Sequence, residues 1–380
     1  MTKLHDLYFQ CGQSPWIDDL RRSYVETEEL DQLITNGVRG LTSNPTIMAK
    51  SIESGTDYDP QFQSLIKAGK TINETYWEMV LFDARGALEK LLAVYEESHG
   101  KDGFVSVEVE PSLAHDTQGT IEAARWLSKT IDAPNLLVKI PATKEGLPAI
   151  EEMIAEGISI NATLIFSLDR YSAVMDAYIN GLERYAASGQ DLSKINSVAS
   201  FFVSRVDTET DKRLEEIIQH TSSDVLGERA KTLLGKTAVA QAIIAYALFK
   251  DKFGSERFLA LKAQSANLQR PLWASTSTKN PNYPDLLYVN ELIGPDTVNT
   301  MPRATVDAFL DHGLPARTID ATMANGHSAV EEAQDTLDAL SEVGVSLFDV
   351  TEQLEKEGVS SFAKSFDELI TQLNGKAASL

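Results

Sequence analysis

The sequence predicts an α/β fold: one (β/α)8 barrel of the TIM type, with extra N- and C-terminal helices. Eight short runs rich in β-branched and aromatic residues alternate with longer stretches of helical periodicity, and this order is typical of a parallel sheet. A length of 380 residues is one that α/β barrels reach as a single domain. No Pro- or Ser-rich linker divides the chain. We therefore expect one domain over residues 1–380, with a C-terminal helical extension from about 317 to 380.

The elements are expected in strict alternation, because parallel neighbours need a long crossover connection. Strands are expected at Trp16–Leu20, Gly37–Thr42, Phe104–Glu110, Leu136–Ile140, Ile158–Phe166, Ser197–Val203, Pro271–Ser275 and Leu286–Leu292. Helices are expected at Thr75–Tyr95, Thr120–Thr130, Gly146–Glu156, Leu168–Ser188, Val206–Thr221, Ser223–Lys252 and, near the C-terminus, Ser361–Leu373. The structural alternative is an open doubly wound sheet. A nucleotide-binding sheet of that kind would carry a glycine-rich first turn, and neither G-x-G-x-x-G nor G-x-x-x-x-G-K-[ST] occurs.

Several of the expected strands are polar on one face only. Side chains alternate between the two faces of a strand, so the three valines of Val105–Val109 share one face, and Ser106 and Glu108 share the other. The runs Leu136–Ile140 and Ile158–Phe166 have the same asymmetry. If the apolar faces pack against the outer helices, five polar side chains point into the barrel: Asp18, Glu108, Lys139, Asn161 and Thr163.

Charged side chains inside a barrel must be paired, since burying an unpaired charge is costly. Asp18 and Glu108 could partly neutralise Lys139. Desolvation disfavours the ammonium form of a lysine in such an interior, and a neutral amine is a nucleophile. Each residue taken alone has a structural explanation: an ion pair, or a polar group that satisfies a neighbour. The convergence of all five exceeds what stability requires and indicates a functional site.

The composition argues against some classes of binding partner and indicates a cellular location. The net charge of −22 argues against nucleic acid and anionic membranes as partners. Cys11 is the one cysteine, so an internal disulfide is excluded. No run of roughly 18 apolar residues predicts a transmembrane helix, and the N-terminus lacks the apolar core of a signal peptide. We expect a cytoplasmic protein; the oligomeric state stays open, and a homo-oligomer is compatible with the sequence.

Four runs carry a resemblance to a known family. They are Leu-Thr-Ser-Asn-Pro-Thr-Ile at 41–47, Val-Lys-Ile-Pro-Ala-Thr at 138–143, Gly-Ile-Ser-Ile-Asn-Ala-Thr-Leu-Ile-Phe-Ser at 157–167 and Ser-Phe-Phe-Val-Ser-Arg at 200–205. In order and spacing they resemble transaldolases, from about Trp16 to about Phe309. The segment from about Arg317 resembles the family less clearly.

The resemblance implies a reaction and its catalytic residues. A transaldolase moves a dihydroxyacetone unit from sedoheptulose 7-phosphate or fructose 6-phosphate to glyceraldehyde 3-phosphate or erythrose 4-phosphate, in the non-oxidative pentose phosphate pathway. Lys139 matches the lysine that forms the Schiff base, and Asp18 matches the acid/base for carbon–carbon cleavage. Glu108 matches the carboxylate that, with Thr163, holds a water for proton transfer. Because the iminium is its own electron sink, no metal or other cofactor is expected.

The resemblance also implies how the sugar phosphates bind. Asn44 and Asn161 match amides that hydrogen-bond the dihydroxyacetone unit, and Ser200 and Arg205 match phosphate ligands. A second basic ligand is expected after the seventh strand, where the family often has arginine. Lys279 is the candidate, and as a point charge it would lack the bidentate geometry of arginine.

Three other functions are weighed against this one. A fructose 6-phosphate aldolase would release free dihydroxyacetone; such relatives typically place Gln and Tyr around the catalytic water, where this chain has Glu108 and Phe202. A non-catalytic sugar-phosphate-binding barrel is disfavoured because Asp18, Glu108 and Lys139 are all present. A metal-dependent lyase is disfavoured because the six histidines lack ligand spacing.

Overall fold

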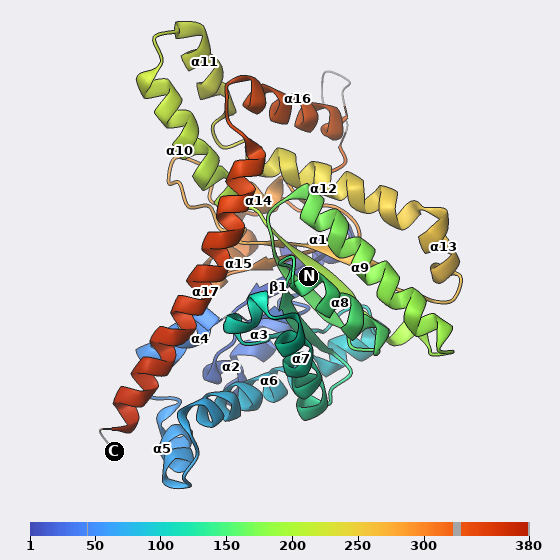
Figure 1. The fold of residues 1–380 in the computed structure, drawn as a ribbon, viewed down its shortest axis with the longest axis vertical. Coiled ribbons are helices and arrows are strands. Elements are labelled where there is room, and N and C mark those ends of the chain that lie inside the picture. Colours follow the sequence, from blue (N-terminus) through green and yellow to red (C-terminus); the bar gives the residue numbers. More distant parts are fainter. Residues whose placement is uncertain (44, 322–327, 379–380) are drawn as a thin grey trace.

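The computed structural model describes residues 1–43, 45–321 and 328–378, and it shows a closed barrel of eight parallel strands surrounded by helices (Figure 1). Each strand pairs with the next one in the chain, and β1 pairs with β8 to close the barrel. The predicted (β/α)8 barrel is therefore confirmed. The strands are β1 Gln13–Asp18, β2 Leu41–Thr42, β3 Val105–Glu108, β4 Leu136–Pro141, β5 Ile160–Ile165, β6 Ser197–Phe202, β7 Gln269–Ala274 and β8 Thr297–Met301.

The helices follow from local signals in the sequence. At the start of α6, for example, the Thr71 side chain accepts from the backbone N–H of Glu74, whose carboxylate accepts in turn from the backbone N–H of Thr71, so two otherwise unpaired donors are satisfied. The helices are α1 Lys3–Phe9, α2 Arg22–Glu26, α3 Glu29–Thr35, α4 Pro45–Ser54, α5 Asp59–Lys67, α6 Ile72–Glu97, α7 Thr117–Ile131, α8 Gly146–Ala155, α9 Leu168–Ala187, α10 Ser204–His220, α11 Asp224–Leu233, α12 Thr237–Gly254, α13 Glu256–Lys262, α14 Leu287–Asn290, α15 Arg303–His312, α16 Ala329–Glu342 and α17 Leu347–Ala377, with the 3-10 helices η1 Pro111–His115 and η2 Leu192–Lys194.

Two expected elements were wrong. Leu286–Leu292 is no strand: it contains the short helix α14, and the eighth strand is Thr297–Met301. The true strand looks polar in sequence, but hydrogen bonds satisfy its buried hydroxyls; Gln13, for instance, donates to Thr297 Oγ1 at 3.0 Å. The helix expected over Ser223–Lys252 is two helices, α11 and α12, because the chain turns at Gly235, where φ is +69°.

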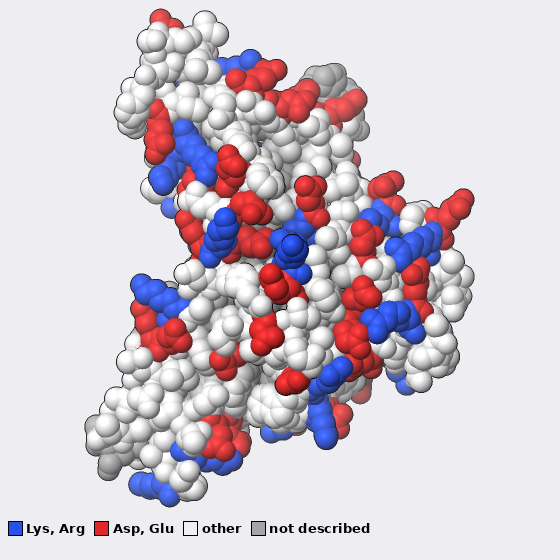
Figure 2. Space-filling model, viewed as in Figure 1, with Lys and Arg blue, Asp and Glu red and all other residues white. Residues whose placement is uncertain are grey.

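Acidic and basic side chains are interspersed over the helical surface (Figure 2). Many of them pair between neighbouring helices: Lys252 of α12 lies 2.8 Å from Asp176 of α9, and Arg257 of α13 lies 2.7 Å from Glu183 of α9. Among the described residues, no single helix is long and apolar enough to cross a membrane, although α11 and α12 together, bent by 58°, have the length and composition.

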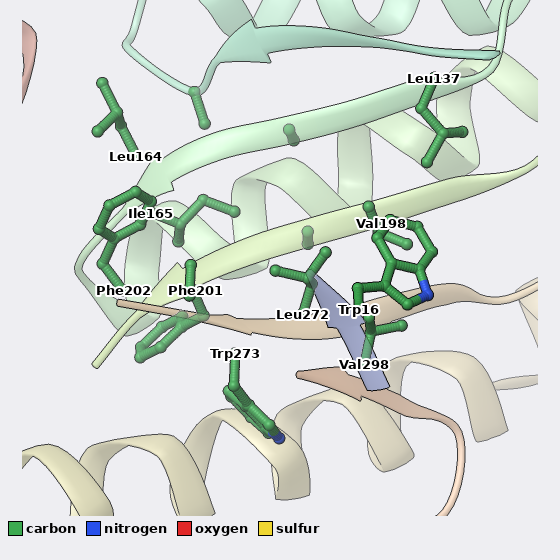
Figure 3. Close-up of a cluster of buried hydrophobic side chains, with 14 of the residues drawn as sticks. Trp16, Leu137, Leu164, Ile165, Val198, Phe201, Phe202, Leu272, Trp273 and Val298 are labelled. Carbon is green, nitrogen blue, oxygen red and sulfur yellow. The ribbon is translucent and has the colours of Figure 1, made fainter. Parts of the chain in front are cut away.

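The barrel interior contains two layers of side chains: an apolar layer, here called the floor, and a polar layer nearer to the carboxyl ends of the strands. The floor side chains come from five different strands and are almost fully buried: Trp16, Leu137, Val198, Leu272 and Val298 (Figure 3). Two residues further along their strands come Asp18, Lys139, Ser200 and Thr300. Since residues i and i+2 share a face, these polar side chains lie one step nearer to the carboxyl ends of the strands.

The C-terminal helix α17 lies across this carboxyl end of the barrel. It packs against α4, α6, α10, η1 and β5, and Figure 1 shows it in red running from beside α10 to beside α4. Arg213 of α10 donates to Gln353 at 2.8 Å, and Thr46 of α4 donates to Ser365 at 2.9 Å. The helix that the sequence predicted at Ser361–Leu373 is part of this longer one.

Candidate active site

A cavity of about 460 Å3 opens at the carboxyl ends of the strands, where the active sites of barrel enzymes lie. Six of the nine residues expected at the site line it: Asp18, Lys139, Thr163, Ser200, Arg205 and Lys279. Glu108 and Asn161 are buried directly behind this wall. The ninth, Asn44, lies outside the described residues.

The reactive centre of the cavity is the pair of Lys139 and Glu108. The two residues are register partners on β4 and β3, and Nζ of Lys139 lies 3.0 Å from Oε2 of Glu108. The ammonium also donates to the backbone carbonyl of Ser43 at 2.9 Å. Burial raises the pKa of Glu108, although the positive charge of Lys139 opposes that rise. Burial thus makes Glu108 a better proton acceptor than an exposed carboxylate, and it lies in contact with the amine.

Unpaired polar atoms surround this ion pair. Apart from the contact with Lys139, the oxygens of Glu108 have no hydrogen-bond partner in the described part of the chain, and the same is true of Thr163 Oγ1. Buried polar atoms are rarely left unsatisfied. Glu108 and Thr163 therefore offer hydrogen-bond sites to a water or to a substrate group.

Thr163 is held at the cavity by an irregular stretch of β5. The pairing with β6 shifts register between Ala162 and Ile165, and Leu164 adopts a left-handed backbone with φ of +59°. Such a conformation costs about 1–3 kcal/mol for a non-glycine residue. Bulges commonly re-aim side chains beside active sites, and here the bulge follows directly after the hydroxyl of Thr163.

Asn161 is fixed by two hydroxyl groups. Its amide Nδ2 donates to Ser106 Oγ at 3.0 Å, and its Oδ1 accepts from Ser200 Oγ at 2.7 Å. The alternative that Asn161 and Thr163 satisfy one another or backbone groups is therefore wrong for the bonds that the structure describes, because both partners of Asn161 are side-chain hydroxyls and Thr163 Oγ1 has no partner among the described residues. Asn161 is fully buried beside Lys139, its register partner on β4.

Asp18 lines the cavity at the end of β1, and its negative charge adds to the rise of the Glu108 pKa. Its Oδ1 accepts from Thr42 Oγ1 at 2.7 Å, and that hydroxyl is also 2.7 Å from Thr300 Oγ1. Neither Thr42 nor Thr300 was expected at the site from the sequence. Thr300 belongs to the strand that was misplaced, and Thr42 is the last residue of the expected strand Gly37–Thr42, whose polar face was not recognised.

Arg205 projects from the first turn of α10 at the mouth of the cavity. Its guanidinium lies over the ring of Phe202, 5.4 Å from the centroid, and it makes no ion pair or hydrogen bond with any residue that the structure describes. Burial lowers the pKa of Arg205. The alternative of an ion pair with Asp207 fails, because that carboxylate accepts from Ala238 N at 2.7 Å and from Tyr288 Oη at 2.9 Å.

Two more cations share the mouth with Arg205. Lys279 lines the cavity from the loop after β7, with its ammonium next to the hydroxyl of Ser277. Arg303, which sequence reasoning missed, lines it from the first turn of α15 and pairs with Asp307 at 3.0 Å and Glu29 at 3.3 Å. It follows β8 directly, so a correct eighth strand would have drawn attention to it.

Sequence reasoning also missed Ser361 and Phe362, which α17 contributes to the cavity wall. No signal in the sequence places a residue so far along the chain at the barrel mouth. Within the described ranges, no three His, Cys, Asp or Glu side chains gather as a metal site.

The fold and the cavity together define a class: a (β/α)8-barrel protein with a lysine–carboxylate pair beneath a cationic mouth. Comparisons with known proteins identify the family. The family model described as transaldolase/fructose-6-phosphate aldolase matches residues 15–373. The chain therefore belongs to the transaldolase/fructose-6-phosphate aldolase family, and the match extends well past Arg317, where the resemblance had looked weaker.

Several curated relatives share about half of their residues with this chain. A transaldolase of Mycolicibacterium smegmatis is 50% identical over 368 residues, covering 96% of this chain and 95% of the relative. A transaldolase of Thermobifida fusca is 50% identical over 364 residues, covering 96% and 95%. Transaldolase 1 of Streptomyces coelicolor is 49% identical over 361 residues, covering 94% and 91%. The similarity thus includes the C-terminal helices.

Proposed function

We propose that this protein is a transaldolase that carries a dihydroxyacetone unit on Lys139 as a Schiff base. The donor is sedoheptulose 7-phosphate or fructose 6-phosphate, and the acceptor is glyceraldehyde 3-phosphate or erythrose 4-phosphate. The observation that supports this most is the buried contact of 3.0 Å between Lys139 Nζ and Glu108 Oε2 at the cavity wall. An amine and a base in direct contact are what imine formation requires.

The first step forms the imine. The ammonium of Lys139 gives a proton to Glu108, whose burial-raised pKa favours acceptance, and the neutral amine attacks the ketone carbon of the donor. The carbinolamine must then lose water, and Glu108 returns the proton to the departing hydroxyl. Thr163 Oγ1, unpartnered among the described residues, is placed to orient the water that relays these protons.

The second step breaks the bond between C3 and C4. Asp18 takes the proton from the C4 hydroxyl, the C–C bond electrons move into the iminium, and an enamine and an aldose phosphate result. Thr42 donates to Asp18 at 2.7 Å and so fixes its orientation. The reverse sequence with a new aldose phosphate completes the transfer, and the iminium supplies the electron sink without a metal or another cofactor.

Substrate recognition divides the cavity into two ends. We assign the phosphate to Arg205 and Lys279 at the mouth, with the hydroxyl of Ser277 beside them. Ser200, expected from the sequence as a phosphate ligand, donates instead to Asn161 beside Lys139. We therefore assign Ser200 and Asn161 to the dihydroxyacetone end. Since phosphorylated sugars do not cross membranes unaided, we propose a cytoplasmic enzyme.

Trapping the intermediate tests the proposal. Enzyme treated with fructose 6-phosphate and borohydride should gain one reduced adduct on the peptide that contains Lys139, detected by mass spectrometry. Lys139→Met should lose both the adduct and turnover, whereas Lys129→Met, at an exposed lysine of α7, should retain both. An adduct on another lysine, or no adduct on the wild type, would refute the assignment.

A further inference from the structure

We infer that Phe362 of α17 shields the Schiff-base site from water and thereby favours transfer of the dihydroxyacetone unit over its release. This inference rests on the proposed function. Phe362 lines the cavity together with Lys139, and Lys139 Nζ lies over its ring, 5.8 Å from the centroid. The side chain is only 5% exposed, so the ring is a fixed part of the wall.

The packing of α17 brings this ring close to the barrel. Gly358 lies one turn before Phe362 on the same helical face, and a methyl group at that position would be 3.2 Å from Leu164 and 3.3 Å from Phe166. Glycine thus allows the helix to approach the bulged strand β5. One turn after Phe362, Phe366 packs edge-on against Tyr76 of α6, with ring centroids 5.2 Å apart.

Hydrogen bonds hold the same helix in place along its length. Arg170 of α9 pairs with Glu355 at 3.3 Å, and Thr46 of α4 donates to Ser365 at 2.9 Å. Lys376, near the C-terminus, pairs with Asp59 of α5. The helix is therefore fixed on both sides of Phe362, and the ring does not depend on a mobile loop for its position.

The chemistry explains why an apolar ring belongs there. After cleavage, Lys139 carries an enamine. Release adds one water overall: the enamine carbon takes a proton, water adds to the resulting iminium carbon, the C–N bond breaks, and free dihydroxyacetone leaves the regenerated amine. Transfer requires that an aldehyde arrives before this water. A ring that offers no donor or acceptor keeps water away from the amine, and its π face stabilises the iminium cation.

Replacing the ring tests the inference. Phe362→Ala leaves room for roughly three water molecules at about 30 Å3 each. With fructose 6-phosphate as donor and erythrose 4-phosphate as acceptor, dihydroxyacetone released per sedoheptulose 7-phosphate formed should rise roughly tenfold, which a change of about 1.4 kcal/mol between the two barriers produces. This ratio does not depend on the fraction of molecules that fold. Phe362→Leu, which keeps most of the apolar volume, should give a smaller rise and decides the question if the alanine variant does not fold.

A matched control lies on the same helix. Phe348 is 67% exposed and does not line the cavity, so Phe348→Ala should keep the wild-type ratio. If the Phe362 variants still form the borohydride adduct on Lys139 but keep the wild-type ratio, the inference is overturned while the proposed function stands. If Phe348→Ala raises the ratio as much, the loss of an aromatic ring anywhere on α17 has the same effect as its loss from the cavity wall, and the inference is again overturned. If the wild type forms no adduct, the proposed function itself fails.

Discussion

Removing the guanidinium of Arg205 should separate phosphorylated from unphosphorylated donors. In the free protein Arg205 makes no ion pair or hydrogen bond with the residues that the structure describes, so a phosphate that reaches it displaces no carboxylate. A hydrogen bond to a charged group contributes about 1.5–3 kcal/mol, and each 1.4 kcal/mol is a factor of about ten. Arg205→Ala should therefore lower kcat/KM for fructose 6-phosphate about 10- to 150-fold.

The assay compares two donors in the same variant. Kinetics with fructose 6-phosphate should show the full loss, whereas fructose, which has no phosphate, should be affected far less. Arg205→Lys keeps the charge but loses the planar fork and should fall between alanine and wild type. Arg213 offers a control on the same helix: it pairs with Glu209 at 2.9 Å and Gln353 at 2.8 Å, outside the cavity, so Arg213→Ala should not discriminate between the donors.

The free energy of unfolding gives an independent check. Arg205 is half-buried without an ion pair among the described residues, and burial outweighs the favourable charge of Glu357, so its charge contributes little to stability and Arg205→Ala should leave the urea midpoint near that of the wild type. Equal losses of kcat/KM for fructose and fructose 6-phosphate, together with a large fall of the midpoint, would show that Arg205 is structural. The phosphate assignment would then be refuted.

Three further changes test the proton chemistry and the buried charges. Glu108→Gln removes the base beside Lys139 and should slow imine formation roughly 100-fold or more, measured as the rate of borohydride trapping; an unchanged rate would contradict the role of Glu108. Phe202→Tyr adds a hydroxyl near the catalytic water and should raise dihydroxyacetone release without acceptor while transfer falls; unchanged release would count against water control at this wall. Burial raises the pKa of Asp207 from 3.8 to about 7, so the folded state favours the protonated carboxyl. The resulting contribution to the free energy of unfolding is on the order of 4 kcal/mol. It is fully present below about pH 4 and is lost as pH rises through 7. Asp207→Asn should flatten that decline in urea midpoints between pH 4 and 7, and parallel curves for the two proteins would disprove the linkage.

The sequence carries enough to predict the barrel and the inward face of its central strands. Lys139 stands out because its neighbours on β4 are apolar and the strand period is two, and Glu108 stands out on β3 for the same reason. Their register, which places them side by side, follows once both strands are parallel neighbours in one barrel. The prediction was good where an apolar face contrasts with a polar one.

The eighth strand was misplaced because its buried polar groups form hydrogen bonds with residues on other segments of the chain. β8 reads as a loop because its threonines and asparagine suggest exposure, yet Gln13 donates to Thr297 and Thr276 donates to Asn299 at 2.8 Å. Arg303 was missed with that strand. Phe362 could not be found at all, because its position depends on how α17 crosses the barrel, and a helical period gives the apolar face of a helix but not the surface on which it packs.

The strong negative charge of the chain does not prevent it from binding the proposed anionic substrates, because the field of distant surface charges is screened whereas the side chains at the cavity act at short range. At physiological ionic strength the field of exposed charges is screened within about 8 Å, and acidic and basic side chains are interspersed on the surface (Figure 2). The electrostatic field on a phosphate at the cavity therefore comes from the nearest side chains. There Glu108 neutralises Lys139, and Asp307 with Glu29 neutralises Arg303. Arg205 forms no such ion pair among the described residues, and the charge of Glu357 acts on it from farther away. Arg205 and Lys279 together therefore provide the positive charge at the mouth that attracts an anion, apart from the polar layer where Lys139 would hold the carbon skeleton.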